Sequence, residues 1–170
     1  MKLKTRELAV FAMLGAIMYV SKVIMEWIPN VHLLGTIIMA YTLVYRKKAL
    51  YPIYVFVFLC GALGGFNAWW IPYLYIWTVL WGVTMLLPKN MPKKVAPIVY
   101  MIVCALHGFC FGILYAPAQA LMFGLSFEAT LAWIASGFYF DMIHGIGNFF
   151  CGMLIMPIVS VLRMLERSAE

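Results

Sequence analysis

The sequence predicts an all-α membrane protein, a six-transmembrane-helix bundle with both termini cytoplasmic. Of its 170 residues, 66% are hydrophobic and only 11% are charged, whereas soluble domains carry about 25% charged residues. A soluble domain of this size would have no means of covering so much apolar surface. The apolar residues also fall in long runs separated by short charge clusters, which is typical of a polytopic membrane protein. We expect one domain, residues 1–170, because no tandem repeat or low-complexity segment interrupts the chain.

The apolar runs define six predicted spans, residues 8–28, 33–45, 49–63, 70–87, 95–122 and 131–162. The first is expected to be a retained helix rather than a cleaved signal peptide, because no small-residue cleavage site follows it. The second and third are short for an apolar core of about 30 Å, so they are either tilted or a re-entrant pair. The last two are long enough to bend, and Pro117 and Pro157 are candidate break points.

The distribution of basic residues predicts the orientation. If the chain crosses six times, eleven of its twelve basic residues fall on one side. They are Lys2, Lys4, Arg6, Arg46, Lys47, Lys48, Lys89, Lys93, Lys94, Arg163 and Arg167. The positive-inside rule makes this side cytoplasmic, and the regularity favours six crossings over the re-entrant alternative. Lys22 is the exception, and its spacing predicts an ion pair with Glu26 one helical turn away.

The last span contains a polar stripe within "FYFDMIHGIGNFFCG", residues 138–152. Asp141, His144 and Asn148 follow the i, i+3, i+7 spacing of one helical face, which Gly137 and Gly152 extend. A carboxylate inside a membrane is costly unless it is paired, hydrated or protonated, so this face should turn onto protein or water. The stripe is either a ligand site or ion relay, or a polar clamp between helices; three such groups on one face favour the first.

Span four has an aromatic stripe formed by Trp70, Tyr73, Trp77 and Trp81. Tryptophan near a span end usually belongs to the interfacial belt, but Trp77 and Trp81 lie too deep for that role. They are either ordinary packing residues or a wall on which a flat organic ligand stacks. His107, midway along span five, is at a depth where it would meet His144 or Asn148, although a lone histidine is more often a core residue.

Several polar residues lie near the predicted outer mouth and together would close a pocket there, although each alone is more typical of a solvated loop or helix end. They are Glu26, Asn30, His32, Asn67, Tyr115 and Gln119. The three histidines do not form a convincing metal site, and the four cysteines lie in apolar runs, where buried thiols are the simplest interpretation. We expect no metal and no cofactor.

Span one presents Ala12-x-x-x-Ala16, a small-residue surface that lets another helix approach closely. The chain has no phosphate-binding glycine-rich loop, no H-E-x-x-H and no G-x-S-x-G. ATP hydrolysis by this chain is therefore not expected.

The chain as a whole resembles the substrate-binding S-components of energy-coupling factor (ECF) vitamin transporters. The resemblance rests on its length, the six predicted spans, a basic cytoplasmic side, Ala12-x-x-x-Ala16 as a match to the A-x-x-x-A motif, and the polar final helix with "FDMIHGIGN". It implies a multi-pass protein of a prokaryotic plasma membrane, with no enzymatic activity of its own and no nucleic-acid partner.

The resemblance also implies a function and partners. S-components bind a vitamin or related micronutrient in a pocket open to the outside, then topple in the membrane to release it inside. Ala12 and Ala16 would contact a transmembrane T-component, which is driven by two cytoplasmic ATPases. Asp141, His144 and Asn148 would line the pocket, with His107, Trp70, Tyr73, Trp77, Asn67 and Glu26 as further candidates. The aromatic wall favours a sizeable, partly flat ligand such as cobalamin or a modified nucleobase.

Three other functions stay open at this point. A small membrane enzyme would use Asp141 and His144 as acid and base, although no second carboxylate or nucleophile lies at matching depth. A standalone ion-coupled transporter would show inverted repeats or broken helices, and the halves of the chain do not pair in that way. A purely structural subunit would tolerate the loss of Asp141 and His144.

Overall fold

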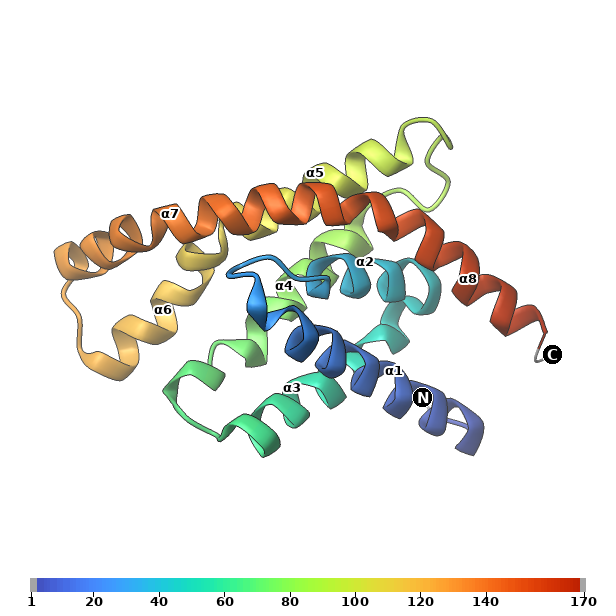
Figure 1. The fold of residues 1–170 in the computed structure, drawn as a ribbon, viewed down its shortest axis with the longest axis horizontal. Coiled ribbons are helices and arrows are strands. Elements are labelled where there is room, and N and C mark those ends of the chain that lie inside the picture. Colours follow the sequence, from blue (N-terminus) through green and yellow to red (C-terminus); the bar gives the residue numbers. More distant parts are fainter. Residues whose placement is uncertain (1–2, 169–170) are drawn as a thin grey trace.

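The computed structural model describes residues 3–168, and every regular element in this range is a helix (Figure 1). The α-helices are α1 (Thr5–Ile24), α2 (Leu34–Tyr45), α3 (Leu50–Gly64), α4 (Tyr73–Leu86), α5 (Ala96–Phe109), α6 (Phe111–Phe123), α7 (Phe127–Cys151) and α8 (Ile155–Arg167). Short 3₁₀ turns η1 (Met25–Trp27), η2 (Arg46–Ala49), η3 (Ala68–Trp70) and η4 (Gly152–Leu154) join or extend them. The all-α prediction is confirmed.

Four helical segments of the described chain are long and apolar enough to cross a membrane: Thr5–Trp27, Leu34–Gly64, Ala96–Phe123 and Phe127–Arg167. Their outer faces carry large apolar side chains such as Met13, Phe58 and Phe138, each more than half exposed. An apolar outer surface is what a lipid environment requires and what water penalises. By length and composition, these helices are compatible with a membrane protein.

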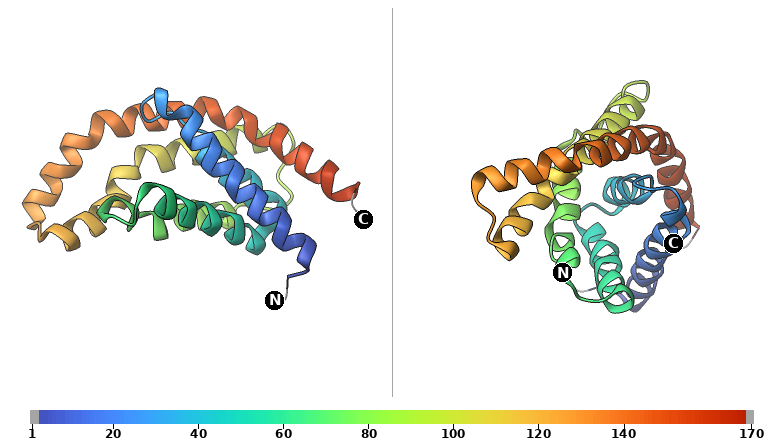
Figure 2. Two further views of the ribbon diagram at one scale, coloured as in Figure 1. Left: turned by 60° about the horizontal axis from the view of Figure 1, so that its bottom comes forward. Right: turned by 60° about the vertical axis from the view of Figure 1, so that its left-hand side comes forward.

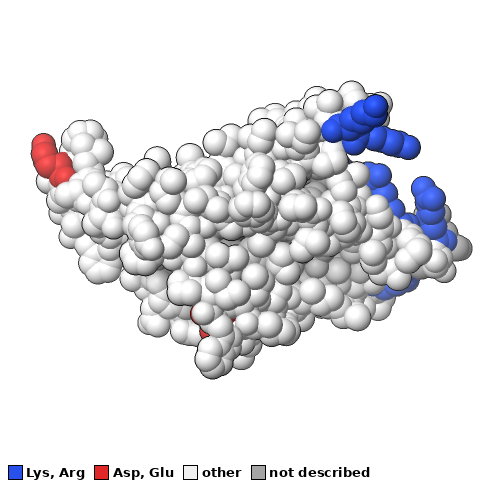
Figure 3. Space-filling view, turned by 45° about the horizontal axis from the view of Figure 1, so that its top comes forward, with Lys and Arg blue, Asp and Glu red and all other residues white. Residues whose placement is uncertain are grey.

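The helices run back and forth along the long axis of the molecule. α1 begins and α8 ends at the same end (Figures 1 and 2). The Lys and Arg side chains seen in Figure 3 gather at this end as well, whereas acidic side chains appear elsewhere on that face. We call this end the basic end.

α2 is the central helix. All of its residues from Leu34 to Thr42 are buried, and a helix that is apolar all round belongs inside a bundle. α4 and α8 pack against it, while α1 packs mainly on α3. Gly15 lets α1 approach α3 closely, because any Cβ there would lie 2.9 Å from the Pro52 carbonyl oxygen of α3.

α2 and α4, with 12 and 14 residues, are shorter than the predicted spans 33–45 and 70–87, whereas α3 has the 15 residues predicted for span 49–63. At ~1.5 Å per residue they are ~18–23 Å long, below the ~30 Å of an apolar membrane core. The chain turns between α2 and α3 at Arg46, whose φ is +53°. This turn is fastened to α4, because the Arg46 side chain donates to the Met85 carbonyl (3.0 Å) and the Arg46 carbonyl accepts from Trp81 Nε1 (3.1 Å).

The two long predicted spans break at other places than Pro117 and Pro157. The first divides at Cys110 into α5 and α6, and the second divides at η4 into α7 and α8. Pro157 lies in the first turn of α8, where a missing N–H costs little, and Pro117 is accommodated inside α6. At Cys110 the physical reason is a competing acceptor: the Gly112 N–H donates to the Asp141 carboxylate of α7.

Candidate functional site

The polar stripe of α7 is buried, as the sequence predicts. Asp141, His144 and Asn148 are 8%, 3% and 0% exposed, so this face turns onto protein. Gly152 extends the buried face and packs against the backbone of α5. Gly137 is only partly buried and has open space around it, so the buried face does not extend that far.

Asp141 is the cap of a neighbouring helix. The Gly112 N–H donates to Oδ1 at 3.0 Å and to Oδ2 at 3.1 Å. This amide lies at the N-terminus of α6, where backbone N–H groups lack helical partners and the helix dipole favours negative charge. The carboxylate thus joins α7 to α6, and a contact between Asp141 and a ligand stays a prediction.

Three histidines that are distant in sequence meet in the interior. The rings of His32 and His144 are 4.6 Å apart, and Phe111 lies 4.9 Å from His144 and 6.1 Å from His107. Trp77 closes the group, with its ring 5.8 Å from His107 and 6.3 Å from His32. Loop 28–33, α4, α5, α6 and α7 each contribute one ring to this assembly.

We define the polar cluster as His32, Trp77, His107, His144 and Asn148. Each of these side chains has one buried polar atom without a hydrogen-bond partner: His32 Nδ1, Trp77 Nε1, His107 Nδ1, His144 Nε2 and Asn148 Oδ1. A buried polar group left unpaired costs about 1–3 kcal/mol, so five cost roughly 5–15 kcal/mol, comparable with the whole stability of a typical domain. Such a concentration is expected where a ligand supplies the missing partners.

The partnered atoms of the cluster hold the unpartnered ones in place. His107 Nε2 is 3.2 Å from the Ile76 carbonyl oxygen, so this nitrogen carries the proton and Nδ1 presents a lone pair. Asn148 Nδ2 donates to the Cys104 carbonyl at 3.2 Å, which leaves the amide oxygen as a free acceptor. This arrangement, in which one end of a side chain is anchored and the other is available, is typical of binding sites.

Loop 28–33 covers the cluster. Asn30 has φ +58°, a left-handed conformation that asparagine tolerates better than most residues, and the turn directs His32 inward. Val31 packs over Gly147, where a Cβ would be 3.1 Å from a Val31 methyl group. Burial lowers the pKa of His32 to about 4, so its ring is neutral at pH 7.

The predicted aromatic stripe, of which Trp70 lies in η3 and the other members in α4, divides into anchored and free members. Trp70 Nε1 donates to the Val57 carbonyl at 2.7 Å, and Trp81 Nε1 bonds to the turn at Arg46. Trp77 is 1% exposed and its N–H has no partner. Tyr73 packs edge-on against Trp77, with ring centroids 5.3 Å apart. Only Trp77 of this stripe therefore belongs to the polar cluster.

The residues predicted at the outer mouth do not all join the site. Glu26 is exposed and pairs with Lys22 at 2.5 Å, which confirms the expected ion pair. Asn67 is also exposed. Tyr115 does approach, because it packs 6.2 Å from Phe111. Phe111 is a further site residue, which the spacing would have indicated only if residues 95–122 were one continuous helix, because it follows His107 by four residues.

Metal-ligating side chains do not converge in the described part of the chain: residues 3–168 contain no group of three or more His, Cys, Asp or Glu that could hold a metal ion. Cys60 and Cys104 are buried as predicted, whereas Cys110 is exposed and Cys151 is partly exposed. Cys110 differs because it occupies the break between α5 and α6 rather than a helix interior. The chain matches no family model, no curated protein and no solved structure.

Proposed function

We propose that this chain is an integral membrane substrate-binding subunit of the ECF type, which captures a vitamin-like micronutrient at the outer face. The observation that supports this proposal most is the polar cluster. Five unpartnered polar atoms surrounded by aromatic rings, in the interior of an apolar bundle, form the kind of site that binds an organic molecule. Uptake would be powered by a T-component and two cytoplasmic ATPases, because the chain has no nucleotide-binding motif.

The proposal includes six membrane crossings with both termini in the cytoplasm of a prokaryotic cell. Its support is the position of the α1 start and the α8 end at the basic end (Figures 1 and 3). The positive-inside rule assigns such an end to the cytoplasm. The short helices α2, α3 and α4 then cross tilted or in a locally thinned bilayer. Cysteine-accessibility labelling of the loops tests this topology.

The chemistry of the cluster favours a neutral, planar heteroaromatic ligand. Trp77 Nε1 only donates, Asn148 Oδ1 only accepts, and imidazole nitrogens do either according to tautomer. The cluster contains no Lys, Arg, Asp or Glu, and a buried ionic ligand needs an opposite charge. Aromatic rings on several sides suit a flat molecule. Of the ligands that the sequence favours, a nucleobase-like ring therefore fits these groups better than cobalamin.

Ligand entry requires loop 28–33 to move. An aromatic ring sandwiched between two others needs about 7 Å between their planes, twice the usual contact distance, whereas the His32 and His144 ring centroids are 4.6 Å apart. Displacing the loop removes His32 and Val31 from α7 and opens the cluster on one side. The loop then closes over the bound ligand, with His32 as a further contact.

The proposed contact with the T-component is Ala12 and Ala16, which are exposed on α1, while Gly15 faces α3. α1 thus keeps one small-residue face for the bundle and leaves another free for a partner helix. Replacing Ala12 and Ala16 by leucine should abolish co-purification with a T-component and leave ligand binding unchanged. Loss of both properties would contradict a dedicated coupling surface.

The enzyme alternative has less support. The Asp141 carboxylate, which would be one member of the acid–base pair, has a structural role instead, because it accepts from the Gly112 amide and caps α6. We therefore retain the binding function alone.

The experiment that tests the proposal is a binding screen by isothermal titration calorimetry on the detergent-purified chain. The panel comprises water-soluble vitamins, corrinoids and nucleobases. Saturable one-to-one binding that Asn148→Leu abolishes and the exposed control Asn67→Leu leaves intact would support it. A folded protein that binds nothing in the panel would contradict it.

A further inference from the structure

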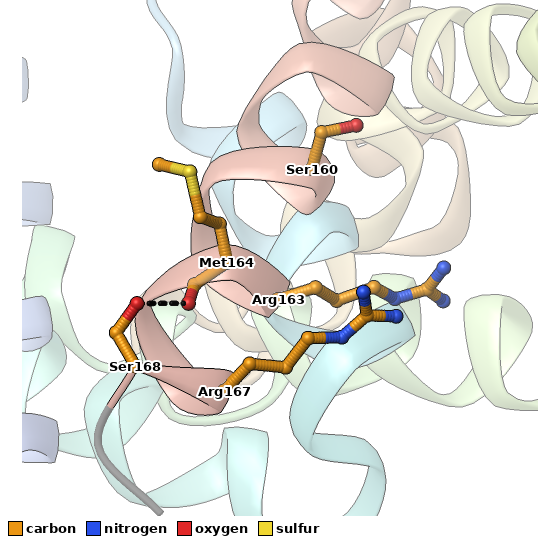
Figure 4. Close-up of a pocket in the computed structure, with 5 residues that line it drawn as sticks. All are labelled: Ser160, Arg163, Met164, Arg167 and Ser168. Carbon is orange, nitrogen blue, oxygen red and sulfur yellow. Dashed lines mark hydrogen bonds between the residues drawn. The ribbon is translucent and has the colours of Figure 1, made fainter.

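A second site, separate from the polar cluster and independent of the proposed ligand, lies near the end of α8. Ser160, Arg163, Met164, Arg167 and Ser168 line a groove of about 410 Å³ (Figure 4). Ser160, Arg163 and Arg167 follow the i, i+3, i+7 spacing of one helical face. Figure 4 shows the two arginine side chains extending in parallel to the same side of the helix.

The two guanidinium groups are available for an anionic ligand. Within residues 3–168, the side chains of Arg163 and Arg167 form no hydrogen bond or ion pair. Like charges held side by side repel each other, so an anion between them relieves repulsion as well as adding bonds. Guanidinium groups are also the side chains best matched to phosphate, because their planar donors bind two oxygens at once.

The hydroxyl groups of the groove add acceptor capacity at its edges. Ser160 Oγ donates to the Met156 carbonyl at 2.9 Å, and Ser168 Oγ donates to the Met164 carbonyl at 3.0 Å. Their oxygen lone pairs stay free to accept from a ligand hydroxyl group. A headgroup that carries both a phosphate and hydroxyls therefore finds partners for each.

The surroundings of the groove indicate a lipid rather than a soluble anion. Met164, which lines the groove together with the two arginines, is 59% exposed, so the groove itself offers apolar surface to an acyl chain. The arginines follow at the basic end, where Lys and Arg side chains gather (Figure 3). A basic groove at this end of an apolar bundle would lie at the level of lipid headgroups, with the apolar surface of the bundle next to it.

We propose that Arg163 and Arg167 bind the phosphate diester of an anionic phospholipid, with the headgroup in the α8 groove and an acyl chain along Met164. A dipole-complementing role at the end of α8 would need only the positive charges. Phospholipid binding needs in addition the paired geometry of the two guanidinium groups.

The test is native mass spectrometry of the full chain released from detergent with phosphatidylglycerol or phosphatidylcholine added. We expect bound phosphatidylglycerol in excess of phosphatidylcholine, and about tenfold weaker retention in the R163Q/R167Q variant, as for loss of charge-assisted hydrogen bonds. The matched control is K93Q/K94Q, which removes the same charge from an exposed loop at the same end. It should bind phosphatidylglycerol as the wild type does.

Three results would overturn the inference. Equal loss in R163Q/R167Q and K93Q/K94Q would mean that net charge alone attracts the lipid. Equal retention of both lipids by the wild type would mean that the groove does not select an anionic phospholipid. Inorganic phosphate could instead displace phosphatidylglycerol and form an adduct that is lost in R163Q/R167Q. That result would mean that the groove binds a free anion rather than a lipid. If R163Q/R167Q does not fold, R163K/R167K replaces it: this variant keeps the charge, and partial loss of binding is expected because the paired donors are gone.

Discussion

Replacing Asp141 by alanine tests whether this carboxylate holds α6 and α7 together. The substitution removes the acceptor of the Gly112 amide, which donates at 3.0 Å and 3.1 Å to the two oxygens. A hydrogen bond to a charged group contributes about 1.5–3 kcal/mol, and loss of a helix cap costs about 1 kcal/mol. We expect a loss of about 2 kcal/mol, which for a chain of this size lowers the unfolding midpoint by roughly 4–8 °C.

The assay is thermal unfolding in detergent followed by circular dichroism. Asp141→Asn keeps one oxygen acceptor without the charge, so its effect should be about half as large. The control Glu26→Gln removes an exposed carboxylate and should leave the midpoint nearly unchanged. An Asp141→Ala variant that unfolds at the wild-type temperature would refute the capping role.

Three further predictions concern packing, pH and the aromatic stripe. Gly108→Ala should destabilise the α5–α7 contact by more than about 1 kcal/mol, because its Cβ would lie 2.8 Å from the Gly145 Cα. The control Gly82→Ala, whose Cβ would have nothing within 4 Å, should be neutral or stabilising by up to about 1 kcal/mol. Equal unfolding midpoints for the two variants would contradict this packing. The pKa of His32 is about 4 in the folded protein against an ordinary 6.5, so unfolding between these pH values takes up a proton and stability should fall as the pH drops from 6.5 to 4. Thermal unfolding of His32→Gln should show a smaller fall over this range. Parallel curves of midpoint against pH for the wild type and His32→Gln would argue against a buried neutral ring. Trp70→Phe, which loses the 2.7 Å bond to an α3 carbonyl, should lower stability by about 1 kcal/mol in the same assay, and an unchanged midpoint would mean that this bond contributes nothing.

Periodicity alone predicts the buried face of α7. The spacing of Asp141, His144 and Asn148 places them on one stripe, and the cost of burying polar groups in lipid turns that stripe inward. Charge clusters likewise predict where the helices end. Both inferences depend only on local spacing and on the solvent, so a single sequence is enough to make them.

Tertiary partners are what the sequence does not reveal. His32 is predicted on a loop at the outer mouth, yet the turn at Asn30 directs it onto His144. Asp141 is predicted to face a ligand, yet its carboxylate accepts from the Gly112 amide at the break between α5 and α6. That break depends on how α5, α6 and α7 pack, and no proline or charge at the junction marks it.

The proposed function depends most on ligand binding by the polar cluster. The most direct test is to measure the dissociation constant of the tightest-binding compound from the screen in two matched variants. Trp77→Phe keeps an aromatic ring but deletes an N–H that has no partner in the protein. Trp81→Phe deletes an N–H on the same helix that is already bonded to the Arg46 carbonyl. We predict about tenfold weaker binding for Trp77→Phe, the value of one hydrogen bond, and wild-type affinity for Trp81→Phe. Wild-type affinity in Trp77→Phe, or equal losses in both variants, would contradict the claim.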